Sequence, residues 1–510
     1  MPPSPRKHLR KTAALAKALK RRDIYDWLVT TGYFPEPYVL PPCFTVTSHP
    51  PYKKDYYFKY SKAGFRPRVD EYVQISFPKT EVTDRTFGTI HPDIHSDIAR
   101  TIAKNWDALL LSLFGGGNQV CSYSFPIPLT ARKRGRIGGL RSGRMIYEFI
   151  EMAEHDIASI AYRFKFLITT DVKNFYSSIY THSIPWAIHG KKRVRTPANR
   201  NNFTFFGNRL DKLFQSANDG CTNGIPVGPA VSDLVSEVVL SGVDRLLSKQ
   251  MTKRGLADNV SVVRFKDDYR ILARTREDGR SVVKELQAAL KEYRLELNDE
   301  KTKFHELPSG LFREWVSRYN ASNPRPKRPY SFKRFKEVYL SVVAIDSELQ
   351  SGVIDRFLAD LVDRKYGGLR VQLTKRSLPK IVSLLLMLAD RRTKAFPMVL
   401  AILETILRSP FGKAHSSDIE DYLVKYLEQL SKAEAENRYL IAWILYFLRA
   451  NGLDGKLAGK FNFKDPIVRA TRTSRFTVFK AQKDFEVFQS VKKAAKRISM
   501  LKHLDVFRPQ

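Results

Sequence analysis

The feature that most constrains the fold is a pair of β-rich segments that flank two adjacent acids. Residues 260–265 read VSVVRF and residues 269–273 read YRILA, with Lys266, Asp267 and Asp268 between them. Such segments on either side of a short polar break are typical of a β-hairpin. We therefore expect a hairpin that carries the two acids at its tip. Adjacent acids are common in turns, so this pair alone indicates no chemistry.

A third acid follows another predicted strand, earlier in the chain. Phe164 to Thr170 is apolar enough for a buried strand, and Asp171 stands at its end. Taken alone, Asp171 is better explained as a turn or helix-capping residue. Three carboxylates at neighbouring strand ends, however, repel one another unless cations neutralise them. Two Mg²⁺ ions about 4 Å apart would resolve that conflict and form a phosphoryl-transfer site. Oxygen ligands without a Cys/His cluster favour Mg²⁺ over zinc.

A loop rich in glycine and proline lies between these acids in the sequence. Gly224, Pro226, Gly228 and Pro229 predict a rigid loop, and the run from Ala230 onward is expected to be helical. Glycine lets a backbone approach a nucleotide closely, and a helix start favours anions. As a lone motif it is weak, because such loops before helices are usually only loops.

The charge of the chain indicates a polyanionic partner. Lys and Arg number 87 against 52 Asp and Glu, which leaves a net charge of +35. An excess of that size opposes compaction unless a polyanion neutralises it, so nucleic acid is the expected partner. A membrane is the rival, but the longest apolar run, Ile381 to Ala389, falls short of the ~20 residues that span a bilayer. With no secretory signal and three widely spaced cysteines, we expect a cytoplasmic protein.

Composition changes along the chain predict four zones. Residues 1–60 are basic and then rich in proline and aromatics, which predicts a short helix followed by irregular chain. Residues 61–310 mix strand-like and helix-like segments. Residues 311–353 include a basic, proline-containing stretch that we interpret as a linker or thumb-like connection. Residues 354–510 carry apolar stripes at helical spacing, which predicts an all-α, helical-repeat domain.

The order and spacing of these motifs resemble the palm of a reverse transcriptase. The segments 171–179, 224–240 and 265–269 resemble its motifs A, B and C, and LELNDEKTKF resembles motif D. The resemblance implies an α/β palm-and-fingers (right-hand polymerase) fold. It also implies RNA-directed synthesis of DNA from dNTPs by two-metal nucleotidyl transfer. The implied catalytic residues are Asp171, Asp267 and Asp268, and the implied ligands of two Mg²⁺ ions are Asp171, Val172, Asp267 and Asp268.

The resemblance further implies contacts with nucleotide and nucleic acid. Tyr176 occupies the sugar-gate position, where a ring would clash with a ribose 2′-hydroxyl; the alternative is a core aromatic. The implied dNTP-binding residues are Tyr176, Arg144, Arg141 and Lys301. The candidates for nucleic-acid binding are Lys133, Arg134, Lys266, Lys327, Arg328, Lys333 and Arg334. Lys266 either contacts primer phosphate or points away. Tyr330, Phe332 and Phe335, interleaved with the later basic residues, suit stacking on bases.

Three segments narrow the resemblance to bacterial antiphage enzymes, the abortive-infection and defence-associated reverse transcriptases. These segments are NFYSSIYTHSIPWAIHGK, GIPVGPAVSDLVSEVVL and RFKDDYRI. That group implies a non-coding RNA partner and homo-oligomers. The chain departs from the family's motif C, which usually reads Tyr-x-Asp-Asp, at two positions. Phe265 replaces the tyrosine, and the variable position holds a cation, Lys266.

Two other functions fit the same residues. The first is a template-independent, possibly protein-primed DNA polymerase, which shares every catalytic residue. The second is an RNA-binding scaffold with a vestigial palm. Three retained acids argue against the scaffold, because drift would tend to remove at least one.

Overall fold

The computed structural model describes most of the chain and divides it into two compact units. The described residues are 5–53, 55–59, 64–79, 83–130, 134–138, 143–325, 327–349, 351–363, 368–457, 461–479 and 484–504, with only the backbone described for 143–149. The first unit comprises Met1–Pro35, His49–Val73 and Gly88–Phe312; the second comprises Glu36–Ser48, Gln74–Phe87 and Arg313–Gln510. The expected extension over residues 1–60 is therefore shared between both units.

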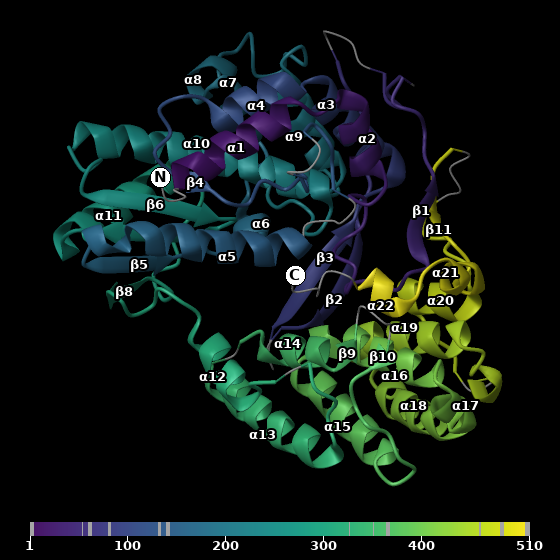
Figure 1. The fold of residues 1–510 in the computed structure, drawn as a ribbon. Helices are drawn as coiled ribbons and strands as arrows, with labels where there is room; N and C mark the ends of the chain where they lie inside the picture. Colours follow the sequence, from purple (N-terminus) through teal and green to yellow (C-terminus); the bar gives the residue numbers. More distant parts are fainter. Residues whose placement is uncertain are drawn as a thin grey trace. The chain divides into compact units, whose positions relative to one another are not determined.

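The first unit is built around a five-stranded sheet (Figure 1). Its strand order is β4 (Cys121–Ser122), β6 (Val260–Phe265), β7 (Asp268–Ala273), β5 (Phe166–Thr170) and β8 (Lys303–Glu306). The β4–β6 pair is parallel, whereas β6–β7, β7–β5 and β5–β8 are antiparallel. The mixed α/β character expected for this part of the chain is confirmed.

Helices cover both faces of this sheet. Successive strand residues point to opposite faces. On one face, Tyr269 contacts α10 (Ala230–Lys253), and Ile168 lies against Gly279 of α11 (Arg276–Glu292). On the other face, Leu167 and Leu272 share a buried cluster with Ile157 of α5 (Gly143–Ile160). The remaining helices of this unit are α1 (Pro5–Lys17), α2 (Arg21–Val29), α3 (Pro92–Lys104), α4 (Trp106–Phe114), α6 (Phe175–Ser178), α7 (Ser183–His189), α8 (Lys191–Val194) and α9 (Phe206–Ser216).

The second unit is mainly helical, as expected for the chain beyond residue 354, but that part of the chain is not all-α, because short strands lie at Val362–Asp363, Gly368–Leu369 and Glu486–Phe488. The helical-repeat arrangement stays a prediction. The helices of this unit are α12 (Glu314–Ser322), α13 (Phe332–Leu349), α14 (Val353–Asp360), α15 (Leu378–Arg391), α16 (Phe396–Leu407), α17 (Pro410–Ala414), α18 (Ser416–Ser431), α19 (Glu434–Ala450), α20 (Pro466–Thr473), α21 (Val491–Arg497) and α22 (Met500–His503). Its short strands form the pairs β1 (Phe44–Ser48) with β11 (Glu486–Phe488) and β9 (Val362–Asp363) with β10 (Gly368–Leu369). The hairpin of β2 (Val73–Pro78) and β3 (Asp84–Thr89) belongs mostly to this unit.

Three local expectations are wrong. Residues 1–60 contain the helices α1 and α2 and the strand β1, rather than one short helix before irregular chain. The stretch 311–353, expected as a linker or thumb-like connection, is largely the helices α12 and α13, which contradicts an irregular linker and leaves the thumb-like interpretation a prediction. Within it, Tyr330 and Phe335 are fully buried, so these rings are core residues and cannot stack on bases. Phe332 is partly exposed.

No helix in the described ranges is long and apolar enough to cross a membrane.

Candidate active site

The strand register brings the three acids to one edge of the sheet. Asp171 directly follows Thr170, which pairs with Tyr269 across β5 and β7. Asp268 is the first residue of β7 and pairs with Phe265 of β6, so Asp267 lies in the connecting turn. Antiparallel neighbours place the end of one strand beside the start of the next. The predicted hairpin and the position of Asp171 after a buried strand are confirmed; the metal-binding role of the acids stays a prediction.

The tip of the hairpin is a tight turn with a left-handed residue. Lys266 has φ +50°, a conformation that is uncommon for residues other than glycine. Its N–H donates to Ser124 Oγ at 2.8 Å, and its carbonyl accepts from Arg264 Nη1 at 2.9 Å. Both polar groups of the turn backbone are thus held by side chains, which fixes the peptide next to Asp267.

A buried charged network beneath the tip anchors the hairpin to α10. The Arg264 guanidinium is fully buried and donates to both oxygens of Glu237 at 2.9 Å. It also donates to Asp244 Oδ2 from Nε at 2.9 Å and from Nη2 at 2.7 Å. Tyr269 donates to Asp244 Oδ1 at 2.8 Å. Two carboxylates therefore accept from one guanidinium, one of them also accepts from a phenol, and charge-assisted bonds of this kind are strong.

Sequence analysis missed this network, although a signal for it exists. Glu237 and Asp244 are seven residues apart and therefore share one face of α10. Arg264 alternates with apolar neighbours in β6, so its side chain points to one face of the sheet. Charges at buried positions of a helix and a strand are expensive unless they meet.

Asp171 pairs with Lys301, the dNTP-binding candidate in the segment that resembles motif D. Lys301 Nζ lies 2.6 Å from Asp171 Oδ2, and this hydrogen bond raises the pKa of Lys301. Asp171 Oδ1 is buried and has no hydrogen-bond partner within the part of the chain that the structure describes. A buried unpaired oxygen is costly, so this atom is available to a further ligand.

The two hairpin acids lie in surroundings that disfavour their charge. Burial, then Asp267 and Asp171, raises the pKa of Asp268 to about 7. Burial also raises the pKa of Asp267. A bound cation would oppose both effects. Over the described ranges, no group of three His, Cys, Asp or Glu residues is close enough to hold one ion.

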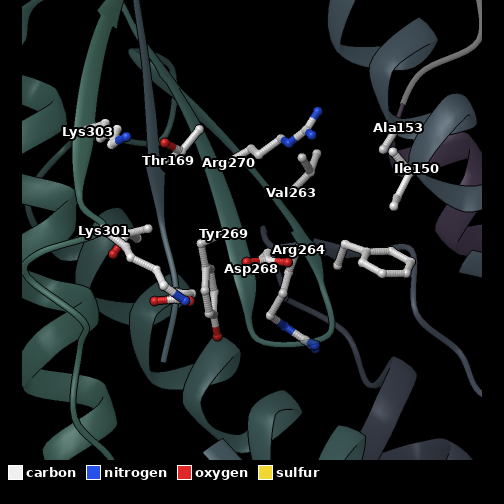
Figure 2. A pocket seen from close by; sticks show the side chains of 13 residues that line it. Ile150, Ala153, Thr169, Val263, Arg264, Asp268, Tyr269, Arg270, Lys301 and Lys303 are labelled. Carbon is white, nitrogen blue, oxygen red and sulfur yellow. The ribbon is translucent and has the colours of Figure 1, made fainter. Parts of the chain in front are cut away.

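A cavity of about 370 Å³ opens on this edge of the sheet. Asp171 and Asp268 line it together with the cations Lys301, Lys303 and Arg270. Figure 2 shows Asp268 and Arg270 on β7, Lys303 on β8 and Lys301 just before β8, with Ile150 and Ala153 of α5 on the opposite side. The cavity therefore joins an acidic edge to a basic wall, a combination that suits a metal-bound phosphate group.

Tyr176 lies on the short helix α6, close to the start of α10. Its hydroxyl donates to Asp233 Oδ1 at 2.5 Å, and its carbonyl accepts from Ile225 N–H at 3.0 Å. Burial, and then Asp233, raises the pKa of Tyr176 well above its ordinary value, so the hydroxyl keeps its proton. Lys266 Nζ lies 3.9 Å from the same Asp233 oxygen, so this side chain points toward α10.

The other candidates are placed as follows. Val172 forms a β-bridge with Leu297. Arg134 is exposed. Lys133 and Arg141, and the side chain of Arg144, lie outside the described residues.

Four basic candidates belong to the second unit. Lys327, Arg328 and Lys333 are exposed. Arg334 instead donates to Asn323 Oδ1 at 3.1 Å and to the Arg325 carbonyl at 2.5 Å. Its guanidinium also lies 4.8 Å from the centre of the Tyr330 ring. Arg334 therefore has structural partners that the other three basic residues do not share in the contacts described.

Solved telomerase structures show limited similarity to the chain. Apo telomerase from Candida tropicalis is 11% identical over 74% of this chain and 69% of that chain, with a TM-score of 0.33. Telomerase from Candida albicans in complex with the TWJ fragment of telomeric RNA is 13% identical over 82% of this chain and 66% of that chain, with a TM-score of 0.31. The corresponding complex from C. tropicalis is 12% identical over 80% of this chain and 65% of that chain, with a TM-score of 0.32. Scores this low support no conclusion about the site.

A family comparison is more specific. No match is found among curated proteins. Residues 133–332 match the model of the reverse transcriptase (RNA-dependent DNA polymerase) family. That range includes the three acids, Tyr176 and Lys301. Over residues 133–332 the chain is therefore similar to the reverse transcriptase family.

Proposed function

We propose that the chain is an RNA-directed DNA polymerase that extends DNA from dNTPs by two-metal nucleotidyl transfer. The observation that carries the proposal is the position of Asp171, Asp267 and Asp268 at adjoining strand ends inside the range that is similar to the reverse transcriptase family. The basic wall of the neighbouring cavity supports it, because a triphosphate needs cations near the metal site.

The donors at this edge fit Mg²⁺. Carboxylate oxygens are the ligands that Mg²⁺ prefers, and Asp171 offers a buried oxygen without a described partner. Asp171, Val172, Asp267 and Asp268 would hold the ions. Bound Mg²⁺ would lower the pKa of the attacking 3′-hydroxyl and neutralise charge on the leaving pyrophosphate.

The protein's own groups supply position and selectivity. The Arg264 network fixes the turn that presents Asp267, and Lys301 donates to Asp171. Lys301 would release Asp171 for the metal and turn to the nucleotide's phosphates. Arg144 and Arg141 are proposed to bind the triphosphate, and Tyr176 to contact the sugar.

The first experiment replaces both hairpin acids by their amides. Asp267→Asn/Asp268→Asn keeps side-chain shape and removes the charge that holds metal. We expect dNTP incorporation to fall by about a hundredfold or more, since several kcal/mol of charge stabilisation are lost. The matched control is Asp299→Asn/Glu300→Gln, an adjacent and exposed acid pair in the same unit, which should stay active. Incorporation near the wild-type rate by the first variant would refute the assignment.

The biological role is proposed from the resemblance of the motif segments and from the charge. We propose that the enzyme acts in bacterial antiphage defence, in the cytoplasm, as a homo-oligomer with a non-coding RNA partner. A net charge of +35 agrees with a carried polyanion.

Sequencing the nucleic acid that copurifies with the full-length protein tests this role. A defined RNA supports templated synthesis. Covalently attached DNA of no fixed sequence would instead favour the template-independent, protein-primed alternative. RNA binding without dNTP incorporation would favour the scaffold.

A further inference from the structure

One buried carboxylate outside the metal site holds the ring of Tyr176. Asp233 lies at the start of α10 and is only 8% exposed. Its Oδ1 accepts the Tyr176 hydroxyl at 2.5 Å. The backbone at and after Tyr176 is also tied, because Ile225 N–H donates to the Tyr176 carbonyl at 3.0 Å and Gly224 N–H donates to the Ile179 carbonyl at 2.9 Å. The ring is therefore held both through its backbone and at its far end.

The same carboxylate faces the tip of the catalytic hairpin. Lys266 Nζ lies 3.9 Å from Asp233 Oδ1, and the lysine side chain is 31% exposed. A buried carboxylate is expensive unless partners satisfy it, and here a phenol and an ammonium do so. Asp233 thus shares one oxygen between α6 and the turn that carries Asp267. Neither contact serves the metal site directly.

The contact matters for how a ring can exclude a hydroxyl group. An aromatic side chain turns about χ1, and χ2 is broad, so an untethered ring can move away from an added atom at small cost. A ring that is held at both ends cannot move away from the added atom. Overpacking then costs about 1–3 kcal/mol, which corresponds to roughly a tenfold to hundredfold change in rate. The hydrogen bond to a carboxylate is of the strong, charge-assisted kind.

We propose that Asp233 is a positioning residue for sugar selection: its carboxylate fixes the Tyr176 ring against which the 2′ position of the incoming nucleotide is read. The inference rests on the proposed function, since Tyr176 meets a sugar only if the domain binds nucleotides. Asp233 of α10 would then join Tyr176 as a residue that determines the preference for dNTPs over rNTPs.

The test measures kcat/KM for a dNTP and for the matching rNTP in the full-length protein. Asp233→Ala and Tyr176→Phe each remove the hydrogen bond but keep the ring, and each should lower the dNTP/rNTP ratio by roughly tenfold. Asp233→Asn keeps an oxygen acceptor and should restore the ratio to within about twofold of wild type. The combined Tyr176→Phe/Asp233→Ala variant should be no worse than either single change, because both remove one interaction. Ser177→Ala, an exposed neighbour on α6, is the control and should leave the ratio unchanged.

Several results would overturn the inference. An unchanged ratio in Asp233→Ala, or effects of the two single changes that multiply in the double variant, means that the carboxylate does not act through the ring. If Asp233→Ala does not fold, Tyr176→Phe is compared with Asp233→Asn. Equal dNTP/rNTP ratios in these two variants would refute a role for the hydrogen bond between Asp233 and Tyr176. Absence of any dNTP incorporation by the wild-type protein would instead refute the proposed function, and this inference with it.

Discussion

Arg264 of β6 and Glu237 of α10 form a buried two-pronged ion pair, with Nη1–Oε2 and Nη2–Oε1 distances of 2.9 Å. Burial alone would lower the pKa of Arg264, but Asp244 and Glu237 raise it well above its ordinary value. The same guanidinium holds the carbonyl of Lys266 in the hairpin turn. The position of Asp267 therefore depends on an ion pair in the interior of the first unit, not only on its own strand.

Loss of the Glu237 charge is expected to reduce both stability and activity. Glu237→Gln keeps the shape of the side chain but leaves Arg264 with one carboxylate and an amide. We expect the free energy of unfolding to fall by about 1.5–3 kcal/mol, the usual worth of a hydrogen bond to a charged group. Because a shift of about 1 Å at a reacting group costs on the order of a hundredfold, dNTP incorporation should fall further than the loss of folded protein explains.

Urea denaturation and incorporation assays at one protein concentration check this expectation. The matched control is Glu292→Gln, which removes an exposed pair with Lys191 at 2.8 Å. Exposed pairs contribute about 0.2–1 kcal/mol, so this variant should resemble wild type in both assays. Equal, small effects in the two variants would show that the buried pair does not support the hairpin.

Lys301 is expected to oppose metal binding and to support catalysis. Its ammonium lies 2.6 Å from Asp171 Oδ2, while 63% of the lysine side chain is exposed. In the nucleotide-free protein it competes with Mg²⁺ for that oxygen. Lys301→Met should therefore tighten Mg²⁺ binding by about twofold to fivefold, the range of a solvent-screened pair, and should lower kcat/KM for dNTP.

Titration calorimetry with Mg²⁺ alone, and steady-state kinetics, measure the two effects separately. Lys303→Met is the control, because Lys303 lines the same cavity without a described contact to Asp171. Weaker Mg²⁺ binding in Lys301→Met than in Lys303→Met would contradict competition at Asp171.

Removal of the Tyr176 ring is expected to admit ribonucleotides. Tyr176→Ala opens the space that the ring fills beside α10, so an added 2′-hydroxyl no longer overlaps it. The dNTP/rNTP ratio of kcat/KM should fall by about tenfold to a hundredfold, with a smaller loss in dNTP use. The Ser177→Ala variant again serves as the control. An unchanged ratio in an active Tyr176→Ala enzyme would mean that Tyr176 is only a core aromatic.

Local patterns predicted the elements that bear the acids. The hairpin 260–273 follows from its β-rich arms, and α10 begins at Ala230, directly after the Gly-Pro loop, as expected. The metal chemistry proposed for the three acids also follows from residue type, and it stays a prediction. The residues that hold the hairpin turn could not be predicted from local patterns, because Arg264 is distant in sequence from Glu237 and Asp244 and meets them only in the fold.

The expectation about the aromatic residues of α13 failed because the sequence does not show directly which face of a helix is buried. Tyr330, Phe332 and Phe335, which alternate with basic residues, were expected to suit stacking on bases. In α13, however, Phe335, Val338, Tyr339 and Val342 form one buried face at helical spacing, and the basic residues lie on the others. The N-terminal zone shows a second limit. Tyr439 donates to the Tyr38 carbonyl at 2.6 Å, a contact that no local pattern around residue 38 predicts.

The exposed basic residues of the second unit are expected to determine part of the salt dependence of nucleic-acid binding. Lys327→Ala/Arg328→Ala/Lys333→Ala removes three charges that no described ion pair uses and leaves the structural Arg334 in place. Each lost phosphate contact lowers the slope of log K against log salt by about 0.7–0.9, so the slope should flatten by roughly two to three units. A control with Lys413, Lys425 and Lys432, exposed lysines at α17 and α18, changes the net charge equally. Fluorescence anisotropy with a labelled RNA, measured from about 50 to about 300 mM salt, gives the slope of log K against log salt for both triple variants. If both triple variants flatten the slope alike, binding follows net charge, and the 327–333 segment is not a specific contact.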